Sequence, residues 1–164
     1  MKRRAKLTPP NIRQARSDGL KDIARLLVSG DREHASAMPY IFNNRESLPR
    51  AEAILSRLKD DDAAVFVAEV ENQIVGIIHL EVQSEEGSPG EQQRDHGWVL
   101  TVDVEPSHRR GGIGRTLMKV AEEWAQSKGV DHLEFMVWEF NISAIRFYSE
   151  LGYTIINHTM SKAL

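Results

Sequence analysis

The 164-residue sequence contains no cysteine. Disulfides, thiolate metal ligands and a cysteine nucleophile are therefore excluded, while the redox compartment stays open. No apolar run approaches the roughly 18 residues that span a bilayer, and no apolar stretch follows the basic residues near the N-terminus (Lys2, Arg3, Arg4, Lys6). The sequence thus predicts neither a membrane span nor a signal peptide. We expect a cytoplasmic protein without a membrane partner.

A strong excess of one charge is also missing. The chain has 21 Lys and Arg against 24 Asp and Glu, which gives a formal net charge of −3. This balance disfavours a large basic surface, so no nucleic-acid partner is expected. The six histidines form no His-x-x-x-His or similar pair, so no metal site is expected either.

The length suits one domain, and we expect a single domain over residues 10–164 behind a flexible basic tail at 1–9. The polar segment 84–95, rich in Gly, Pro and charge, is too short for a linker and predicts a mobile loop. Periodicity predicts the following order of elements: strand 11–15, a helix that begins near 17, an irregular stretch 31–44, a helix from about 46 to 58, strands 64–69, 74–82 and 98–104, helix 112–128, strand 133–138, helix 141–151 and strand 153–159.

This order predicts an α/β fold. The strand–helix–strand unit over 98–138 should be a right-handed crossover with parallel strands. The two strands joined by the short turn Glu71-Asn72-Gln73 should form an antiparallel hairpin. We therefore expect a twisted mixed sheet flanked by about four helices.

The segment 109–114, Arg-Arg-Gly-Gly-Ile-Gly, opens a long amphipathic helix directly after a strand. The first turn of a helix has N–H groups without intrahelical partners, and the helix dipole adds positive charge there. Glycines let an anion approach the backbone, so the pattern predicts a phosphate site. A glycine-rich connection with no ligand is the alternative. Neither a P-loop sequence nor a Gly-x-Gly-x-x-Gly fingerprint is present.

The spacing Arg109-x-x-Gly112-x-Gly114 resembles the acetyl-CoA signature of the GCN5-related N-acetyltransferase (GNAT) family. The preceding Val102-x-Val104-x-Pro106 matches the usual surroundings. The resemblance implies a bulged strand whose backbone binds pantetheine and a turn whose amides bind the pyrophosphate of coenzyme A. It implies these cofactor-binding residues: Val102, Asp103, Val104, Arg109, Arg110, Gly111, Gly112, Ile113, Gly114, Arg115, Asn141 and Tyr148.

The segment from Asn141 to Tyr153 resembles the family's second motif, Asn-x-x-Ala-x-x-x-Tyr-x-x-x-Gly-Phe/Tyr. In the family the Asn side chain bonds pantetheine and the Tyr hydroxyl protonates the departing thiolate. A phenol with a pKa near 10 holds its proton at neutral pH. The structural alternative is that Asn141 only caps a helix and Tyr148 only fills the core.

The implied reaction is direct attack of a neutral amine on the thioester carbonyl, with a backbone N–H at Val104 or its neighbour as the oxyanion donor. Members of the family often carry a Glu or His base where this chain has Trp98 and Leu100. The candidate bases that remain are His96, Asp103, Glu81 and Glu139. With Tyr148, His96 forms the predicted catalytic pair.

The acceptor is expected to be a small-molecule amine, bound by the segment 31–44, the loop 84–95 and the C-terminal strand. Six residues form either its pocket or part of the core: His34, Met38, Tyr40, Phe42, Trp98 and Trp138. The alternatives are a protein or peptide acceptor and a non-catalytic acyl-CoA-binding module. The resemblance makes a homodimer the default assembly.

Overall fold

The computed structural model describes residues 9–42 and 47–163. The expected flexible tail therefore lies outside the described residues except for its last position. The elements in chain order are β1 Asn11–Gln14, α1 Leu20–Ala37, α2 Ser47–Ser56, β2 Ala63–Val70, β3 Gln73–Glu85, β4 Arg94–Val104, α3 Ile113–Ser127, β5 Leu133–Phe135 and α4 Ile142–Glu150. Short 3-10 turns precede α1, follow α2 and follow β4. No helix in the described ranges is long and apolar enough to cross a bilayer.

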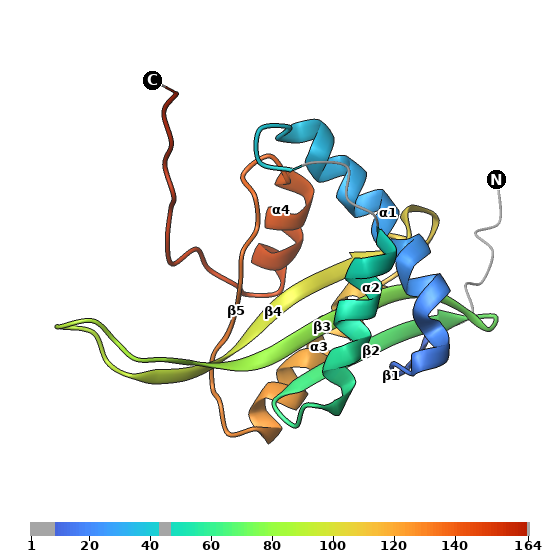
Figure 1. Ribbon diagram of the computed structural model, residues 1–164, viewed down its shortest axis with the longest axis horizontal. Coiled ribbons are helices and arrows are strands. Elements are labelled where there is room, and N and C mark those ends of the chain that lie inside the picture. The colour runs from blue at the N-terminus through green and yellow to red at the C-terminus, as the bar shows by residue number, and fades with distance from the viewer. Residues whose placement is uncertain (1–8, 43–46, 164) are drawn as a thin grey trace.

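The five strands form one twisted sheet in the order β1-β2-β3-β4-β5 (Figure 1). The first four strands are antiparallel neighbours, whereas β4 and β5 run parallel. The crossover through α3 was predicted to give this parallel pair, so the mixed sheet is confirmed. The α/β fold with four α-helices is confirmed as well.

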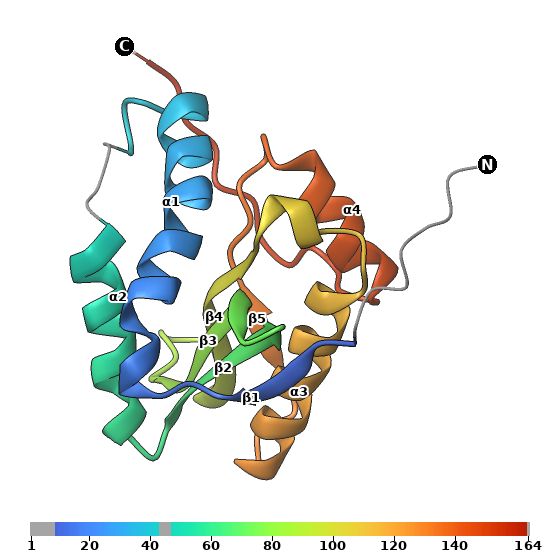
Figure 2. The same cartoon turned by 90° about the vertical axis from the view of Figure 1, so that its right-hand side faces the viewer.

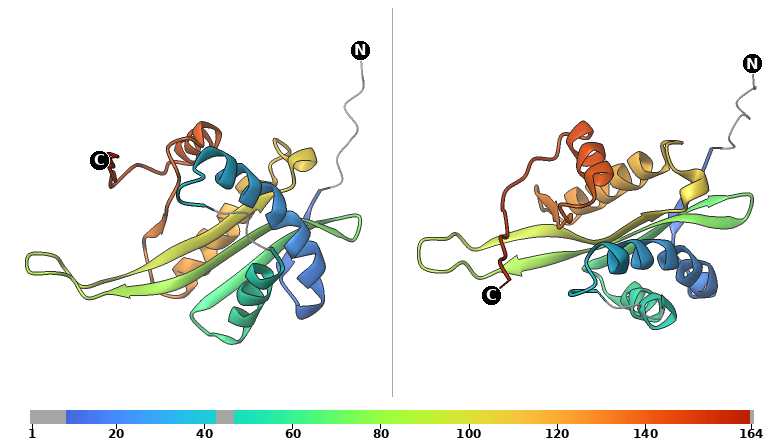
Figure 3. Two further views of the ribbon diagram at one scale, coloured as in Figure 1. Left: turned by 45° about the horizontal axis from the view of Figure 1, so that its top comes forward. Right: turned by 90° about the horizontal axis from the view of Figure 1, so that it is seen from above.

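The helices cover both faces of the sheet. Helices α1 and α2 lie on one face, and α3 and α4 lie on the other (Figures 2 and 3). Each layer has its own apolar core, one centred on Ile23, Leu27 and Ile77, the other on Ile78, Leu117 and Met118. Gly76 of β3 allows α3 to approach closely, because a Cβ there would lie 3.1 Å from the side chains of Ile113 and Leu117.

Two connecting segments differ from the sequence prediction. The stretch 31–44 was expected to be irregular, but α1 continues through Ala37 and only then ends, just before Pro39. The residues Arg32 to Ala37 are good or neutral helix formers, so the helix continues although its apolar spacing is lost. The predicted loop 84–95 is shorter than expected, because β3 extends to Glu85 and β4 begins at Arg94 to form a long hairpin.

The predicted strand 153–159 is wrong for this single chain. Residues 154–163 join no ladder among the described residues, and all of them are exposed. The residues have high strand propensity, but a strand forms only where a neighbour satisfies its backbone groups. The strand predicted over 133–138 is also shorter than expected, since pairing with β4 ends at Phe135.

Candidate functional site

The candidate site lies where strands β4 and β5 stop pairing with each other. Strands β4 and β5 pair only where Gly97, Trp98 and Val99 lie beside Leu133–Phe135. The register between β3 and β4 then shifts, so that Leu100 is an extra residue on β4. This is the bulge that the resemblance implied, and bulges commonly end pairing next to functional sites. Beyond it, Val102 to Val104 pair with β3, and no described strand pairs with their other edge.

The turn from β4 into α3 presents a run of free amides. Within the described part of the chain, no acceptor bonds the backbone N–H groups of residues 110 to 115. The first backbone bond of the helix is from Thr116 N to Gly112 O, at 3.0 Å. Arg110 and Gly112 adopt left-handed backbone conformations, with φ of 62° and 88°. Consecutive amides of this kind, at a helix N-terminus and among arginines, form an anion site.

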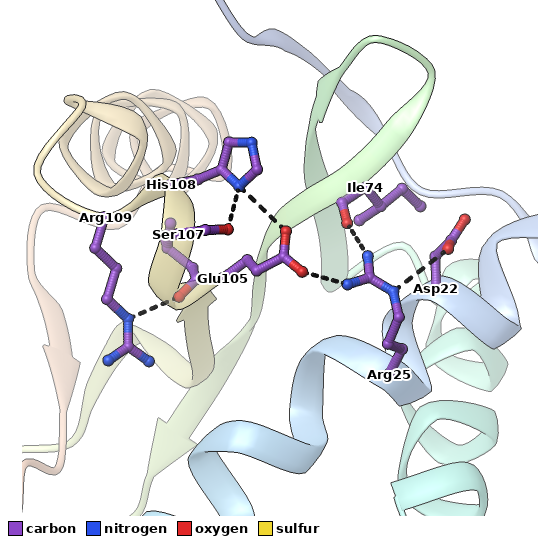
Figure 4. A network of polar contacts seen from close by, with 8 residues as sticks. Asp22, Arg25, Ile74, Glu105, Ser107, His108 and Arg109 are labelled. Carbon is purple, nitrogen blue, oxygen red and sulfur yellow. Dashed lines mark hydrogen bonds and ion pairs between the residues drawn. The ribbon is translucent and has the colours of Figure 1, made fainter.

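Arg109 shapes this turn. Its Nε donates a 2.8 Å hydrogen bond to the carbonyl of Val104, and its Nη2 lies 3.6 Å from Asp103 Oδ1. The guanidinium therefore folds back onto the end of β4, as Figure 4 shows. Arg109 thus stabilises the turn through contacts within the chain, and its predicted contact with coenzyme A stays a prediction.

A polar network ties the turn to α1 and β3 (Figure 4). Arg25 donates to Glu105 Oε1 at 2.5 Å and to the carbonyl of Ile74 at 2.9 Å. On the other side of Glu105, His108 Nδ1 lies 3.1 Å from Oε2 and 3.0 Å from Ser107 Oγ. The contacts of Arg25 and His108 with Glu105 thus join the residues before the turn to α1 and β3.

Helix α4 packs on the first turn of α3. A Cβ at Gly114 would lie 3.2 Å from the Phe147 ring, so only glycine allows this approach without displacement. The contact brings Tyr148 beside the open edge of the sheet, where its ring packs on Phe135 with centroids 4.3 Å apart. Gly114, Phe147 and Tyr148 are thereby brought into one corner.

Asn141 caps α4, since its Oδ1 accepts a 3.1 Å bond from the amide of Ala144. The Oδ1 atom of Asn141 therefore caps the helix, as the structural alternative predicted. Its side-chain nitrogen donates no bond among the described residues, so it can still serve a ligand. The pantetheine contact of Asn141 remains a proposal.

Asp103 is the most perturbed acid near the turn. Its carboxylate lies against Gly30 of α1, where a Cβ would be 2.8 Å from Oδ2. Burial raises the pKa of Asp103 to about 6, although Arg109 and the amide of Val104 oppose the rise. A carboxyl group with a pKa near neutrality suits proton transfer.

Tyr148 lies close enough to Asp103 for their charges to interact. Burial raises the pKa of Tyr148 to about 12, and the negative charge of Asp103 adds to the rise. The phenol therefore keeps its proton throughout the physiological range. The two side chains contact different layers: the carboxylate of Asp103 lies against Gly30 of α1, and the ring of Tyr148 packs on Phe135 and Phe147.

His96 lies far from Asp103. His96 pairs with Gln83 of β3. It precedes Asp103 by seven residues on β4, a separation of roughly 20 Å along a strand. Its side chain is fully buried beside Trp98, and neither ring nitrogen has a partner among the described residues. The structure thus does not bring the predicted pair His96 and Tyr148 together, and of the candidate bases Asp103 is the one whose charge acts on the pKa of Tyr148.

An aromatic cluster lies on α1 and the segment after β5. His34 packs edge-on against Phe42 and Phe140, with centroids 5.2 and 5.3 Å apart, and Phe42 contacts Trp138 at 5.2 Å. His34 Nδ1 also lies 2.8 Å from the carbonyl of Gly30, the residue that touches Asp103. Three of the six pocket candidates, His34, Phe42 and Trp138, thus form one cluster, and His34 lies one helical turn after Gly30, which lies against Asp103.

The other candidates lie elsewhere. Trp98 packs on His96, and Tyr40 is 75% exposed. Phe140 was not predicted, although it follows Trp138 by two residues and shares the aromatic character of that segment. A cavity of about 720 Å³ lies on the side of α1 that carries Asp31. Its lining residues are Val28, Asp31, Arg32, Ala35, Ser36, Pro39, Phe42 and Ser47. Phe42 therefore contacts both the cavity and the aromatic cluster.

Comparison with known families identifies one match. The profile described as the acetyltransferase (GNAT) family matches residues 27–153, which include the turn, Asp103 and Tyr148. A mycothiol acetyltransferase from Thermobispora bispora is 33% identical over 98 residues, covering 57% of this chain and 31% of that protein. A streptothricin acetyltransferase from Streptomyces lavendulae is 40% identical over 55 residues, covering 34% of this chain and 29% of that protein. The match thus spans about a third of the length of these relatives.

Solved structures extend the likeness to nearly the whole chain. A mutant of the BH1408 protein from Bacillus halodurans superimposes with a TM-score of 0.88 and 25% identity, over 94% of this chain and 99% of that one. Aminoglycoside N-acetyltransferase AAC(6')-Iy, solved in complex with CoA, gives a TM-score of 0.73 at 18% identity, with 94% of each chain covered. At that identity the second likeness supports the fold alone.

Proposed function

The chain belongs to the acetyltransferase (GNAT) family, and we propose that it transfers the acetyl group of acetyl-CoA to a primary amine of a small molecule. The observation that carries the proposal is the run of six amides at residues 110 to 115 that bond no acceptor in the described ranges, beside an edge of β4 that no described strand covers. Amides fixed in this way fit a pyrophosphate, and the edge of β4 offers backbone groups to an extended chain such as pantetheine. The residues present therefore fit coenzyme A.

Asp103 is proposed as the base in place of His96. In the reaction the amine nitrogen bonds to the thioester carbonyl carbon, the carbon–sulfur bond breaks, and one proton leaves the nitrogen. Asp103 Oδ2 can take that proton, because its pKa of about 6 leaves the carboxylate charged at neutral pH while keeping it a better base than an exposed aspartate. Its negative charge would also attract the ammonium form of the acceptor.

Tyr148 is proposed as the donor to the departing sulfur. A phenol with a pKa of about 12 is a weaker acid than a thiol with a pKa near 8.5, so full proton transfer to the thiolate is uphill. Tyr148 would therefore act mainly through a hydrogen bond that strengthens as charge develops on sulfur. The sulfur can then collect its proton from solvent.

The aromatic cluster is proposed to line one side of the pocket that binds the amine substrate. Aromatic faces beside a carboxylate bind an organic cation, the carboxylate by charge and the rings by cation–π contact. Relatives named for mycothiol and streptothricin acetylation act on small molecules, which supports the same class here. A protein or peptide acceptor is the second candidate, and a non-catalytic acyl-CoA-binding module is the third.

Calorimetry with acetyl-CoA tests the proposal first, with dephospho-CoA and ATP as comparison ligands. One-to-one binding of acetyl-CoA, followed by amine-dependent release of free thiol, is the expected result. Turnover only with peptides would select the second candidate, and binding without turnover across an amine panel would select the third. No binding at high micromolar acetyl-CoA would contradict the function as a whole.

Replacing Tyr148 by phenylalanine should lower kcat by about 10- to 100-fold, because one hydrogen bond to a charged atom is lost in the transition state. The affinity for acetyl-CoA should stay within about threefold, since the ring and its packing on Phe135 remain. Steady-state kinetics and calorimetry separate the two effects.

Tyr153→Phe is the matched control for this variant. Tyr153 packs on the same Phe135 ring with centroids 5.0 Å apart, but its hydroxyl donates to Glu122 at 2.8 Å. Its loss should leave kcat nearly unchanged. Equal kcat values for the two variants would remove Tyr148 from the mechanism.

A further inference from the structure

Arg50 of α2 bonds both of the elements that enclose Asp103. Its Nη1 donates to Asp31 Oδ1 of α1, and its Nη2 donates to Thr101 Oγ1 of β4 at 3.2 Å. Thr101 is buried, and the side chain of Asp31 is 15% exposed. A half-buried ion pair adds little net stability, because the cost of removing its charges from water offsets their attraction. Stability alone therefore does not explain why Arg50 bonds these two residues.

Both partners of Arg50 adjoin Asp103. Thr101 precedes Asp103 by two residues on β4, beyond the bulge, so the two side chains leave the same face of the strand. Asp31 follows Gly30, the residue of α1 that lies against the Asp103 carboxylate. The guanidinium of Arg50 is thus fixed near Asp103 by contacts with α1 and with β4.

Arg109 reaches the same carboxylate from the opposite direction along β4. Its Nη2 lies 3.6 Å from Asp103 Oδ1, where the strand leads into the turn. Arg50 bonds the strand on the other side of Asp103, at Thr101. Two guanidinium groups therefore flank Asp103. Burial raises the pKa of Asp103 to about 6, and the positive charges of Arg109 and Arg50 both oppose this rise.

Other titratable groups lie on the elements packed around Asp103. Burial lowers the pKa of His79, which pairs with Thr101, and raises the pKa of Tyr148 to about 12, so both side chains are neutral at pH 7. The negative charge of Asp31 disfavours the Asp103 carboxylate. The full set comprises Asp31 and His34 on α1, Arg50 on α2, His79 on β3, Arg109 in the turn and Tyr148 on α4.

We propose that Arg50 is a positioning residue, whose guanidinium keeps the buried carboxylate of Asp103 ionised near neutral pH. This inference rests on the proposed role of Asp103 as the base. A carboxylate that α1 covers loses part of its water, and a cation fixed nearby replaces some of the stabilisation that water gave. Because two bonds hold the guanidinium in place, the charge needs no rearrangement when the amine arrives.

NMR titration of the Asp103 carboxyl carbon in the free enzyme tests the inference. Arg50→Gln should raise the pH at which this carboxyl is half protonated by about 0.5–1 unit, less than the 1–3 units typical of a charge in direct contact. Arg50→Lys keeps the charge but loses the planar fork, and its midpoint should stay within about 0.3 unit of wild type. Asp31→Asn removes the opposing charge, so its midpoint should fall.

A role limited to packing predicts a different pattern. Loss of the fork in either Arg50 variant would then admit water to Asp103, and both midpoints would fall together. Such a common fall, or an unchanged midpoint in Arg50→Gln, would overturn the inference. Arg57→Gln is the matched control, because Arg57 forms its ion pairs with Asp60 and Glu81 instead. Its midpoint should equal that of wild type.

The Asp31→Asn background covers the case in which Arg50→Gln alone does not fold. In that background no buried acid loses its partner, and adding Arg50→Gln should again raise the midpoint, relative to Asp31→Asn alone. No rise there would contradict the inference.

Rate profiles against pH separate this inference from the proposed function. If Asp103 is the base, the pH at which the acetylation rate rises should move with the Asp103 titration in each variant. A titration that moves while the rate profile does not would support the effect of Arg50 on Asp103 and contradict the role of Asp103 as the base.

Discussion

Replacing Asp103 by asparagine should make the protein more stable at pH 8 and nearly inactive. Burial raises the pKa of Asp103 to about 6 from an ordinary value of 3.8. The folded protein therefore binds the proton more tightly than the unfolded chain does, and its stability falls as pH rises from about 4 to about 6. Above that range the charged carboxylate destabilises the fold by about 3 kcal/mol relative to an aspartate whose pKa does not change on folding.

The gain from asparagine is smaller than this figure. An amide at position 103 leaves its own N–H groups without assured partners, which costs about 1–2 kcal/mol. We therefore expect a rise of about 1–2 kcal/mol in the free energy of unfolding at pH 8. Below about pH 4 the wild-type carboxyl is largely protonated in the folded state and the charge penalty is gone, so only the cost of the amide remains and the variant should be about 1–2 kcal/mol less stable than wild type. Urea unfolding of the wild type and the variant at pH 8 and at pH 4 measures the difference in the free energy of unfolding at each pH.

The activity should fall by about 100- to 10,000-fold, the range typical of losing a general base. The wild-type rate should also rise with pH through about 6 as Asp103 loses its proton, and the variant should lack this rise. Two former candidates serve as controls: Glu139→Gln makes the same chemical change, and His96→Gln removes the buried imidazole. An active Asp103→Asn enzyme beside an inactive His96→Gln enzyme would return the role to His96.

The fold was largely predictable because its main signals are local. The stripe of apolar residues on α3, the short apolar runs of β2 and β3 on either side of a tight turn, and the glycine-rich turn all specify their own conformations. Handedness then made β4 and β5 parallel without any information on contacts. The segment 153–159 shows the limit of such reasoning, since its composition favours a strand but a partner decides whether one forms.

The parts of the candidate site that depend on neighbours in sequence could be predicted, whereas the parts that depend on distant residues could not. The turn at 109–114 and the cap at Asn141 depend on neighbours a few residues away. The environment of Asp103 depends on Gly30 in α1 and on Arg109 in the turn, and only the folded chain brings Gly30 to it. His96 and Asp103 differ little as residues in a sequence. What distinguishes the two residues is their burial, the residues they contact and their different positions along β4.

Gly112→Glu should abolish the binding of acetyl-CoA, with an affinity loss of at least about 100-fold, or about 2.7 kcal/mol. The new carboxylate would lie at the start of α3, beside the free amides of residues 110 to 115, and would compete with phosphate for them. Its Cβ would meet no atom within 4 Å, so packing is not disturbed. The backbone strain at φ of 88° costs about 1–2 kcal/mol and is partly offset by the favourable charge at the helix N-terminus.

The chain offers a matched control at the other end of the same helix. Gly129 has φ of 81°, and a Cβ there also meets no atom within 4 Å. Gly129→Glu thus imposes the same strain and the same charge, but far from the free amides. Calorimetry should show normal acetyl-CoA binding for Gly129→Glu and none for Gly112→Glu, while thermal melts report that both remain folded. Equal affinities in the two variants would mean that the turn does not hold the phosphates, whatever activity the enzyme has. Gly112→Ala then separates strain from charge, because it keeps the strain without the carboxylate and should weaken binding by only about 10-fold.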